Sequence, residues 1–264
     1  MKKESKSIIL SYAGFYGERF EDFISIAARK GFDGVQLIPD QDPNLYTSFD
    51  RKRQASLVDA MRQYSLDIHL HNVFYDINIV SVVPEVQENS LKITESVLVL
   101  ARGLGAKTLT VHPGYMFPGW RGDKVQTARF WDAAQVGMER LSCMSQEYGL
   151  TILIENGSYF VTTATSDRRR PLHVGITIEE IERLLAYGDG IGVCLDLGKV
   201  RASGIDPVEM IDALSDRIYQ FQISNWDDLM YTNTGVQAGL SIVFEGGPGE
   251  MLDRFQRGNF GAPI

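Results

Sequence analysis

Three short apolar runs constrain the fold of this chain more than any other feature, because each ends abruptly in a chemically useful residue. The first run ends in His112. The second ends in Glu155 followed by Asn156, and the third ends in Asp196. A strand that is buried along its length and then stops at a polar residue brings that residue to the rim of a core. The recurrence predicts several strands whose ends meet at one place.

Strand-like and helix-like segments alternate along the chain around these runs. We expect strands at about residues 7–13, 35–38, 66–71, 107–112, 151–155, 191–196 and 217–224. We expect helices at about residues 17–30, 53–64, 84–104, 124–148 and 177–188, and another that starts at residues 206–207. Because each connection is long enough for a crossover, the seven strands are expected to be parallel with right-handed links.

A closed barrel and an open doubly wound sheet both satisfy this alternation. No glycine-rich phosphate loop follows the first strand, which weakens the dinucleotide-binding form of the open sheet. Polar residues at the carboxyl ends of successive strands favour the barrel, because barrel active sites collect there. No linker or repeat marks a boundary, so we predict one domain over residues 1–264, an α/β protein with the (β/α)8 TIM barrel fold.

Composition narrows the class of function. The net charge of −8 weakens sequence-independent binding to nucleic acid, which depends on lysine and arginine contacts to phosphate. No apolar run approaches the roughly 20 residues that span a bilayer, and the amino-terminal apolar run is too short for a signal peptide. Cys143 and Cys194 fall inside an expected helix and strand, which predicts buried, reduced thiols and a cytoplasmic protein.

Four residues that can bind metal end four successive expected strands. They are His71, His112, Glu155 and Asp196. In a barrel all four would point into one mouth, and imidazole and carboxylate are ligands for zinc, manganese or magnesium. Each residue alone could instead cap a strand end, but four at corresponding positions favour a functional site.

Several segments, in their order and spacing, resemble a known family. Their sequences are HNVFYDIN from His71, PEV from Pro84, LGAKTLTVHPG from Leu104, GFDGV from Gly31, IEN from Ile154 and CLDLG from Cys194. Together they are similar to the xylose-isomerase-like TIM barrels, which include sugar isomerases, sugar epimerases and apurinic-site nucleases of the endonuclease IV group.

The resemblance implies roles for the strand-end residues. Glu155 matches a family glutamate that binds metal and, in isomerases and epimerases, can also move a proton. Asp196 matches a second metal ligand. Histidines that match His71 and His112 bind metal in the nuclease branch and more often line the substrate pocket in the sugar branch.

The sequence departs from the family pattern at three places. Lys199 stands where members usually carry histidine, and the seventh strand offers Gln220 and Gln222 in place of a metal-binding histidine. The last segment, residues 258–264, resembles the approach to the eighth strand, so we expect that strand to be short, truncated or replaced. Glu245 could replace the glutamate that normally ends it, or be a surface residue.

A missing eighth strand would leave an unpaired seam in the barrel. Unpaired strand edges are usually covered by another segment or another chain. A homodimer across the seam is therefore a prediction.

Lys199 permits a second hypothesis about the site. Its ammonium group could take over the charge of a lost metal, pair with Asp196 and Glu155 and stabilise an enolate, or it could act as an amine base. It could equally be a solvated lysine in the loop after the sixth strand.

The remaining candidates would contact substrate. They are His71, Asn156, Gln222, Trp226 and Arg168. Arg168 begins a run of three arginines that could bind a phosphate or carboxylate, or simply be solvated. Trp226 could form a wall against a sugar ring or pack a loop.

We therefore expect an isomerase or epimerase, or a related lyase, that acts on a sugar or related hydroxy-carbonyl compound by proton abstraction. Its catalytic residues would be Glu155, Lys199 and His112. Glu155 and Asp196 would be the ligands of a reduced metal site for manganese, magnesium or zinc, if a metal is bound. The partner would be a small, sugar-like molecule, without nucleic acid or membrane. The alternatives are a non-catalytic binding barrel and, less well supported, an apurinic-site endonuclease.

Overall fold

Eight short strands form the centre of the computed structural model of this chain. The structure describes residues 7–15, 17–42, 45–46, 50–73, 76–158, 160–161, 169–170, 173–223 and 242–245. The barrel strands are β1 (Ser7–Ser11), β2 (Gly34–Leu37), β3 (Asp67–His71), β4 (Thr108–Val111), β5 (Thr151–Glu155), β8 (Gly192–Asp196), β9 (Ile218–Ile223) and β10 (Ile242–Glu245). They close in the order β1-β10-β9-β8-β5-β4-β3-β2. The predicted barrel is confirmed.

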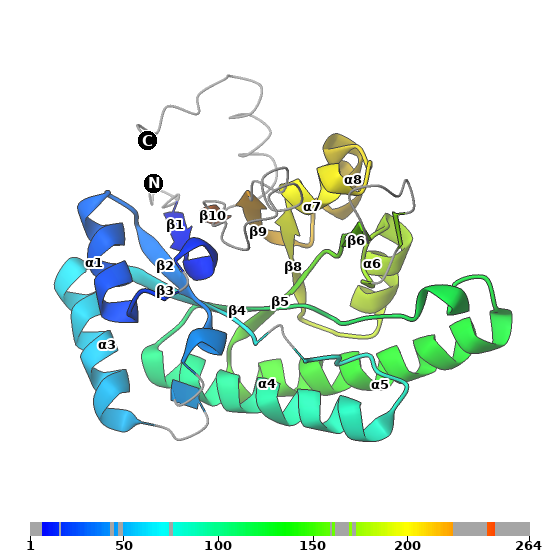
Figure 1. Cartoon of the computed structure of the whole chain (residues 1–264), viewed down its shortest axis with the longest axis horizontal. Coiled ribbons are helices and arrows are strands. Elements are labelled where there is room, and N and C mark those ends of the chain that lie inside the picture. The colour runs from blue at the N-terminus through cyan, green and yellow to red at the C-terminus, as the bar shows by residue number, and fades with distance from the viewer. Residues whose placement is uncertain are drawn as a thin grey trace.

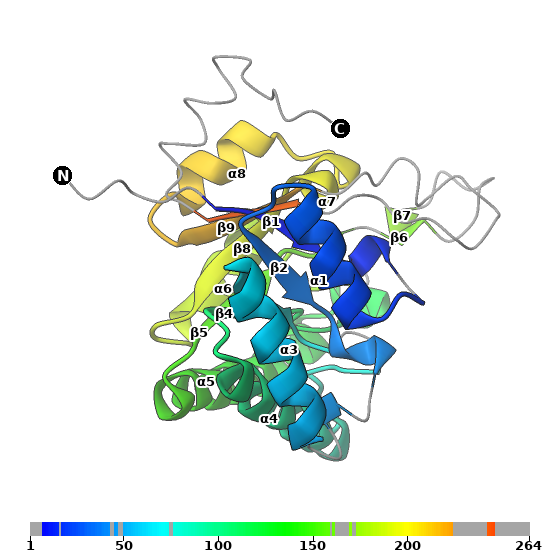
Figure 2. The same ribbon diagram turned by 90° about the vertical axis from the view of Figure 1, so that its left-hand side faces the viewer.

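The helices lie around this barrel (Figure 1). They are α1 (Phe20–Arg29), α3 (Arg51–Tyr64), α4 (Pro84–Leu104), α5 (Lys124–Tyr148), α6 (Ile178–Ala186), α7 (Leu197–Ala202) and α8 (Pro207–Leu214). Three single turns, η1 (Tyr12–Gly14), η2 (Pro39–Gln41) and η3 (Pro118–Trp120), and a small hairpin of β6 (Phe160–Val161) and β7 (Arg169–Arg170) complete the described elements. Figure 2 shows α1 and α3 on one side, with α4 and α5 packed together below and α8 above.

Local sequence explains where the helices begin and end. Pro84 occupies the first turn of α4, where a missing N–H costs little, and Gly105 ends the helix in the left-handed conformation at φ 73°. Thr177 caps α6 by accepting a hydrogen bond from the N–H of Glu180. The buried side of α4 consists mainly of leucine, valine and alanine that pack into the core. These signals predicted the positions of the helices to within a few residues, apart from the short helix α7.

The eighth strand is replaced by a short strand that runs in the opposite direction. The six strand pairings from β1 through β9 are parallel, whereas β10 is antiparallel to both β1 and β9. Ile242 lies opposite Leu10, and Glu245 lies opposite Ser7, the first residue of β1. The expectation of a replaced eighth strand is confirmed.

This reversal bears on two expectations. Because β10 fills the position between β1 and β9, the described barrel has no open seam, and the structural reason for a homodimer is lost. Glu245 ends β10 beside the amino-terminal end of β1. Glu155 lies at the carboxyl end of a parallel strand, so Glu245 lies towards the other end of the barrel and its position does not support a role as metal ligand.

Two further expectations have different outcomes. Cys194 is buried in β8 as expected, but Cys143 is exposed, because it lies on the outward side of α5. Their places inside an expected helix and an expected strand had suggested that both are buried. Within the described residues, no helix is both long enough and apolar enough to cross a membrane.

Candidate active site

The mouth of the barrel brings together side chains from three strands and a short helix. His71 and Glu155 are the last residues of β3 and β5, and His112 directly follows β4. Lys199 comes from α7, the single short helix that continues from β8. The prediction that these strand ends meet is confirmed by the contacts among them.

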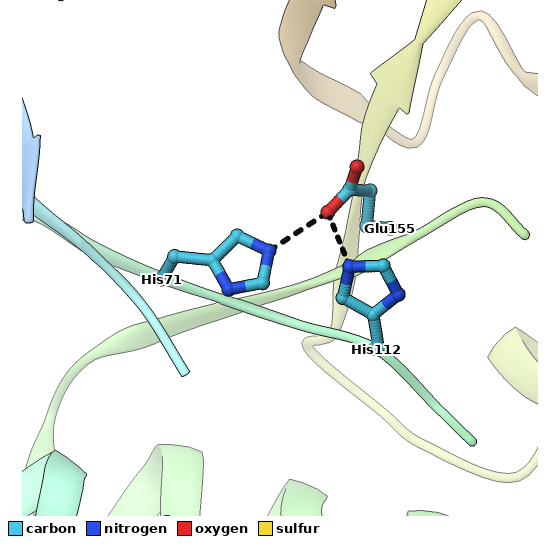
Figure 3. Close-up of side chains that lie close together, drawn as sticks. All are labelled: His71, His112 and Glu155. Atoms are coloured by element: carbon cyan, nitrogen blue, oxygen red, sulfur yellow. Dashed lines mark hydrogen bonds and ion pairs between the residues drawn. The ribbon is translucent and has the colours of Figure 1, made fainter. Parts of the chain in front are cut away.

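Glu155 is the centre of this cluster. One of its carboxylate oxygens, Oε2, lies 2.9 Å from Nε2 of His71 and 3.0 Å from Nε2 of His112 (Figure 3). The two imidazole rings are 5.1 Å apart between their centroids. Only 1% of Glu155 is exposed, so its charge depends on these neighbours rather than on water.

Lys199 supplies the compensating positive charge. Its ammonium donates to the other carboxylate oxygen, Oε1 of Glu155, and lies 3.3 Å from Nε2 of His112. Only 6% of Lys199 is exposed, which rules out the solvated lysine that the sequence also allowed. A buried ammonium is stable only when it is paired, and Glu155 provides that pair.

Helix α7 explains why Lys199 points inward. Asp196 caps this helix, and its Oδ1 accepts a hydrogen bond of 3.1 Å from the backbone N–H of Lys199. The contact expected between Asp196 and the lysine therefore involves the backbone, whereas the ammonium pairs with Glu155. Among the described residues, the compact group of potential metal ligands contains His71, His112 and Glu155 but not Asp196.

The surroundings fix the charges of two members of the cluster. Burial would raise the pKa of Glu155, but Lys199, His112 and the histidine hydrogen bonds together hold it well below 4.5. Burial and the Lys199 ammonium lower the pKa of His112 to about 3, against the effect of Glu155. At neutral pH the site therefore contains a carboxylate and a neutral His112.

The hydrogen bonds of His71 test whether a metal fits here. Its Nδ1 lies 2.7 Å from the backbone oxygen of Asn72, which can only accept, so Nδ1 carries a hydrogen. In the neutral ring Nε2 then presents a lone pair towards Glu155. A cation between the two groups, or a second proton on the ring, removes this repulsion. A histidine held in this way is typical of a metal ligand.

The donor set could therefore hold a divalent ion. One ligand atom from each of His71, His112 and Glu155 lies within 4.8 Å of the others. Two imidazoles and a carboxylate match catalytic zinc sites, which leave a further position open. The ammonium of Lys199, however, already contacts two of these three residues.

The other predicted contact residues have different positions. Asn156 joins β5 to β8: its Oδ1 accepts from the N–H of Asp196 at 2.6 Å, and its Nδ2 donates to the Asp196 carbonyl at 3.2 Å. Gln222 is buried on β9, with Oε1 3.9 Å from Sγ of Cys194. Their contact with substrate stays a prediction. Arg168 and Trp226 lie outside the described residues.

Sequence reasoning missed His173. Only 8% of it is exposed, and its ring centroid is 6.1 Å from that of His112 and 5.0 Å from that of Tyr115. Burial, followed by the charge of Lys199, lowers its pKa to about 4. Arg121 holds this segment by donating to the His173 carbonyl at 2.6 Å. No strand ends at His173, so the strand-end pattern could not reveal it.

Fold and site together define a TIM barrel with a charged, histidine-containing mouth. A family model described as the xylose isomerase-like TIM barrel matches residues 24–246. The chain therefore belongs to the xylose isomerase-like TIM barrel family. A comparison with curated proteins finds no match.

Solved structures of sugar epimerases share this fold. A D-tagatose 3-epimerase-like protein is 20% identical with a TM-score of 0.64, over 80% of this chain and 72% of that one. A D-psicose 3-epimerase studied with D-fructose is 14% identical with a TM-score of 0.66, over 83% and 73%. The 3-keto-D-glucoside 4-epimerase from E. coli is 17% identical with a TM-score of 0.64, over 82% and 78%. At these identities the likeness establishes the fold alone.

Proposed function

We propose that this protein is an isomerase or epimerase of a small sugar or related hydroxy-carbonyl compound. The observation that carries the proposal is the buried carboxylate of Glu155, held between the Lys199 ammonium and two histidines at the barrel mouth. A carboxylate beside a positive donor is what proton abstraction next to a carbonyl requires. The epimerases that share the fold support a sugar-like substrate.

Lys199 would activate both the substrate and the base. When the substrate carbonyl oxygen accepts a hydrogen bond from the ammonium, Glu155 loses part of the interaction that holds its pKa low. The carboxylate then becomes a stronger base at the moment when the neighbouring C–H becomes more acidic. Glu155 takes the proton, the C–H electron pair enters the enolate, and Lys199 stabilises the negative oxygen.

The return of the proton distinguishes the two reactions. In an isomerase, Glu155 returns it to the former carbonyl carbon, while the proton of the neighbouring hydroxyl moves to the former carbonyl oxygen. In an epimerase, a second group must deliver a proton to the opposite face of the same carbon, and His112 would serve only after its neutral Nε2 has taken a proton from the adjacent Lys199 ammonium. His71 would orient the carboxylate. A divalent ion on His71, His112 and Glu155 would, in place of the Lys199 ammonium, supply Lewis-acid polarisation of the substrate oxygens.

Solvent-proton exchange tests this function directly. The protein is incubated in D2O with a panel of ketoses, aldoses and keto sugars, with and without chelator, and deuterium at the carbon next to the carbonyl is followed by NMR. We expect incorporation by the wild type, a loss of about 1,000-fold in Glu155→Gln and about 100-fold in Lys199→Met.

Glu88→Gln is the matched control, because Glu88 pairs with Arg140 on the surface helices, away from the barrel mouth. It should exchange at the wild-type rate. Absence of exchange with every substrate, in the presence of added divalent metal as well, would contradict the proposal and favour a non-catalytic binding barrel.

A further inference from the structure

The Lys199 ammonium and the potential metal site use the same atoms. A divalent ion on this donor set needs the lone pair of Nε2 of His112 and the charge of the Glu155 carboxylate. The ammonium lies 3.3 Å from that nitrogen and donates to that carboxylate. An imidazole nitrogen has one lone pair, so it cannot accept from an ammonium and bind a metal at the same time.

Charge adds to this conflict. Lys199 is within contact distance of two of the three ligand residues, so an ion bound to them would lie a few ångströms from a full positive charge. Repulsion between charges at such a separation is strong away from bulk water, where screening is weak. Glu155 supplies one negative charge, which the ammonium already balances.

The Lys199 ammonium is held in the site by burial and by the position of its backbone. Lys199 is only 6% exposed, and its backbone N–H is bound by the Asp196 cap at the start of α7. Val200, the next residue of the helix, is also buried. To make room for a metal, the side chain would have to leave its buried position and give up its ion pair.

We propose that Lys199 and a divalent cation are alternative occupants of the position between Glu155 and His112, so that Lys199 keeps the wild-type site free of metal. His71, whose Nδ1 is fixed by the Asn72 carbonyl, preserves the geometry of a ligand. Replacing Lys199 by an uncharged residue should therefore create a three-ligand metal site. This inference concerns the occupancy of the site proposed to be catalytic, and it does not depend on turnover.

Metal binding tests the proposal without any activity assay. Chelator-treated wild type and Lys199→Met are titrated with Zn²⁺ by calorimetry, and bound zinc is counted after equilibrium dialysis. We expect Lys199→Met to bind one zinc ion about 100-fold more tightly than the wild type, because the nearby positive charge is removed. The double variant Lys199→Met/His71→Ala should lose this gain.

Lys107→Met is the control for the loss of one positive charge. Lys107 is surface-exposed and pairs with Asp67 at 2.6 Å, away from the barrel mouth, so this variant should bind zinc as weakly as the wild type. Lys199→Arg keeps the charge and should also bind weakly. If Lys199→Met does not fold, Lys199→Gln replaces it, and folding is checked by circular dichroism.

Two results would overturn the proposal. One is tight binding of a single zinc ion by the wild type, with an affinity equal to that of the neutral variant. The other is a folded neutral variant that gains no zinc affinity and whose thermal midpoint zinc does not raise. Neither result depends on exchange in D2O, so this inference and the proposed function can fail separately.

Discussion

His69 and His71 lie two residues apart on β3, and their environments are very different. Both are buried. His69 contacts the hydroxyl of Thr108 at 2.9 Å and the amide of Gln220 at 3.0 Å, both uncharged groups. His71 contacts the Glu155 carboxylate at 2.9 Å. Because residues i and i+2 of a strand share a face, both imidazoles point into the barrel. They lie in two successive layers of its interior.

The polar groups in the barrel interior around His69 and Gln36, together called the lower layer, are uncharged and hold strands together. Besides the contacts of His69, Ser11 donates to Gln36 at 3.0 Å, and Gln36 donates to Thr110 at 3.3 Å. These bonds join β1, β2 and β4, as the His69 group joins β3, β4 and β9. The mouth layer instead contains an ammonium and a carboxylate. Polar residues inside a barrel thus stabilise it in one layer and can perform chemistry in the next.

Glu155→Gln should have the largest effect on stability. It leaves the Lys199 ammonium buried without the carboxylate that neutralises it, and breaking a buried pair in this way costs about 3–5 kcal/mol. Urea unfolding of the variant measures the loss. The double variant Glu155→Gln/Lys199→Met, which removes both charges, should recover most of it. No recovery would show that the pair does not control stability.

His69, in the lower layer, should make the free energy of unfolding decrease at acidic pH. Burial, followed by the charge of Lys107, lowers the pKa of His69 from 6.5 to about 4. Between these values the unfolded chain binds a proton that the folded chain does not, so stability falls as pH falls from 6.5 towards 4.

His69→Gln removes this titration. At pH 5, 1.5 units below 6.5, the wild type should lose about 2 kcal/mol more than the variant relative to pH 7. Urea unfolding at both pH values measures the difference, while proton exchange at pH 7 should persist in the variant. Equal pH sensitivity of the two proteins would argue against a neutral, buried His69.

Much of the mouth layer was predictable from sequence, whereas the uncharged layer below it was not. Short apolar runs located the strands, helix caps located most of the helices, and the strand-end rule found His71, His112 and Glu155. The direction of β10 was not predictable, because a strand of four residues is too short for its sequence pattern to indicate the direction in which it pairs. Helix α7 has six residues, one of them Gly198, and continues directly from β8, so nothing in the sequence separated it from a loop.

Those two features limited what the sequence could predict about the site. Without α7, the sequence could not show whether Lys199 faces solvent or Glu155. With β10 reversed, Glu245 lies away from the mouth. The approach of His173 to His112 depends on a long connection after β5, whose path is set by tertiary contacts such as that of Arg121 with the His173 carbonyl.

Ser11→Ala tests the lower layer with a smaller expected effect. The Ser11 hydroxyl donates to Oε1 of Gln36, and a typical buried hydrogen bond contributes about 1 kcal/mol. The variant should lose about that much stability in urea unfolding and keep its rate of proton exchange. A large loss of exchange at unchanged stability would mean that the two layers are coupled.

Asp196→Asn should have the smallest effect, and it separates two roles of this residue. As the cap of α7, Asp196 accepts from the N–H of Lys199, and asparagine caps helices about as well as aspartate does. Stability should therefore stay within about 0.5 kcal/mol of the wild type.

Zinc affinity of Lys199→Met should also be unchanged by the added Asp196→Asn substitution, because Asp196 is outside the compact ligand group. If Asp196 were a metal ligand, as the family resemblance implied, the loss of its charge would weaken zinc binding while the helix cap survived. Zinc calorimetry on Lys199→Met with and without Asp196→Asn decides whether Asp196 is only a helix cap or also a metal ligand.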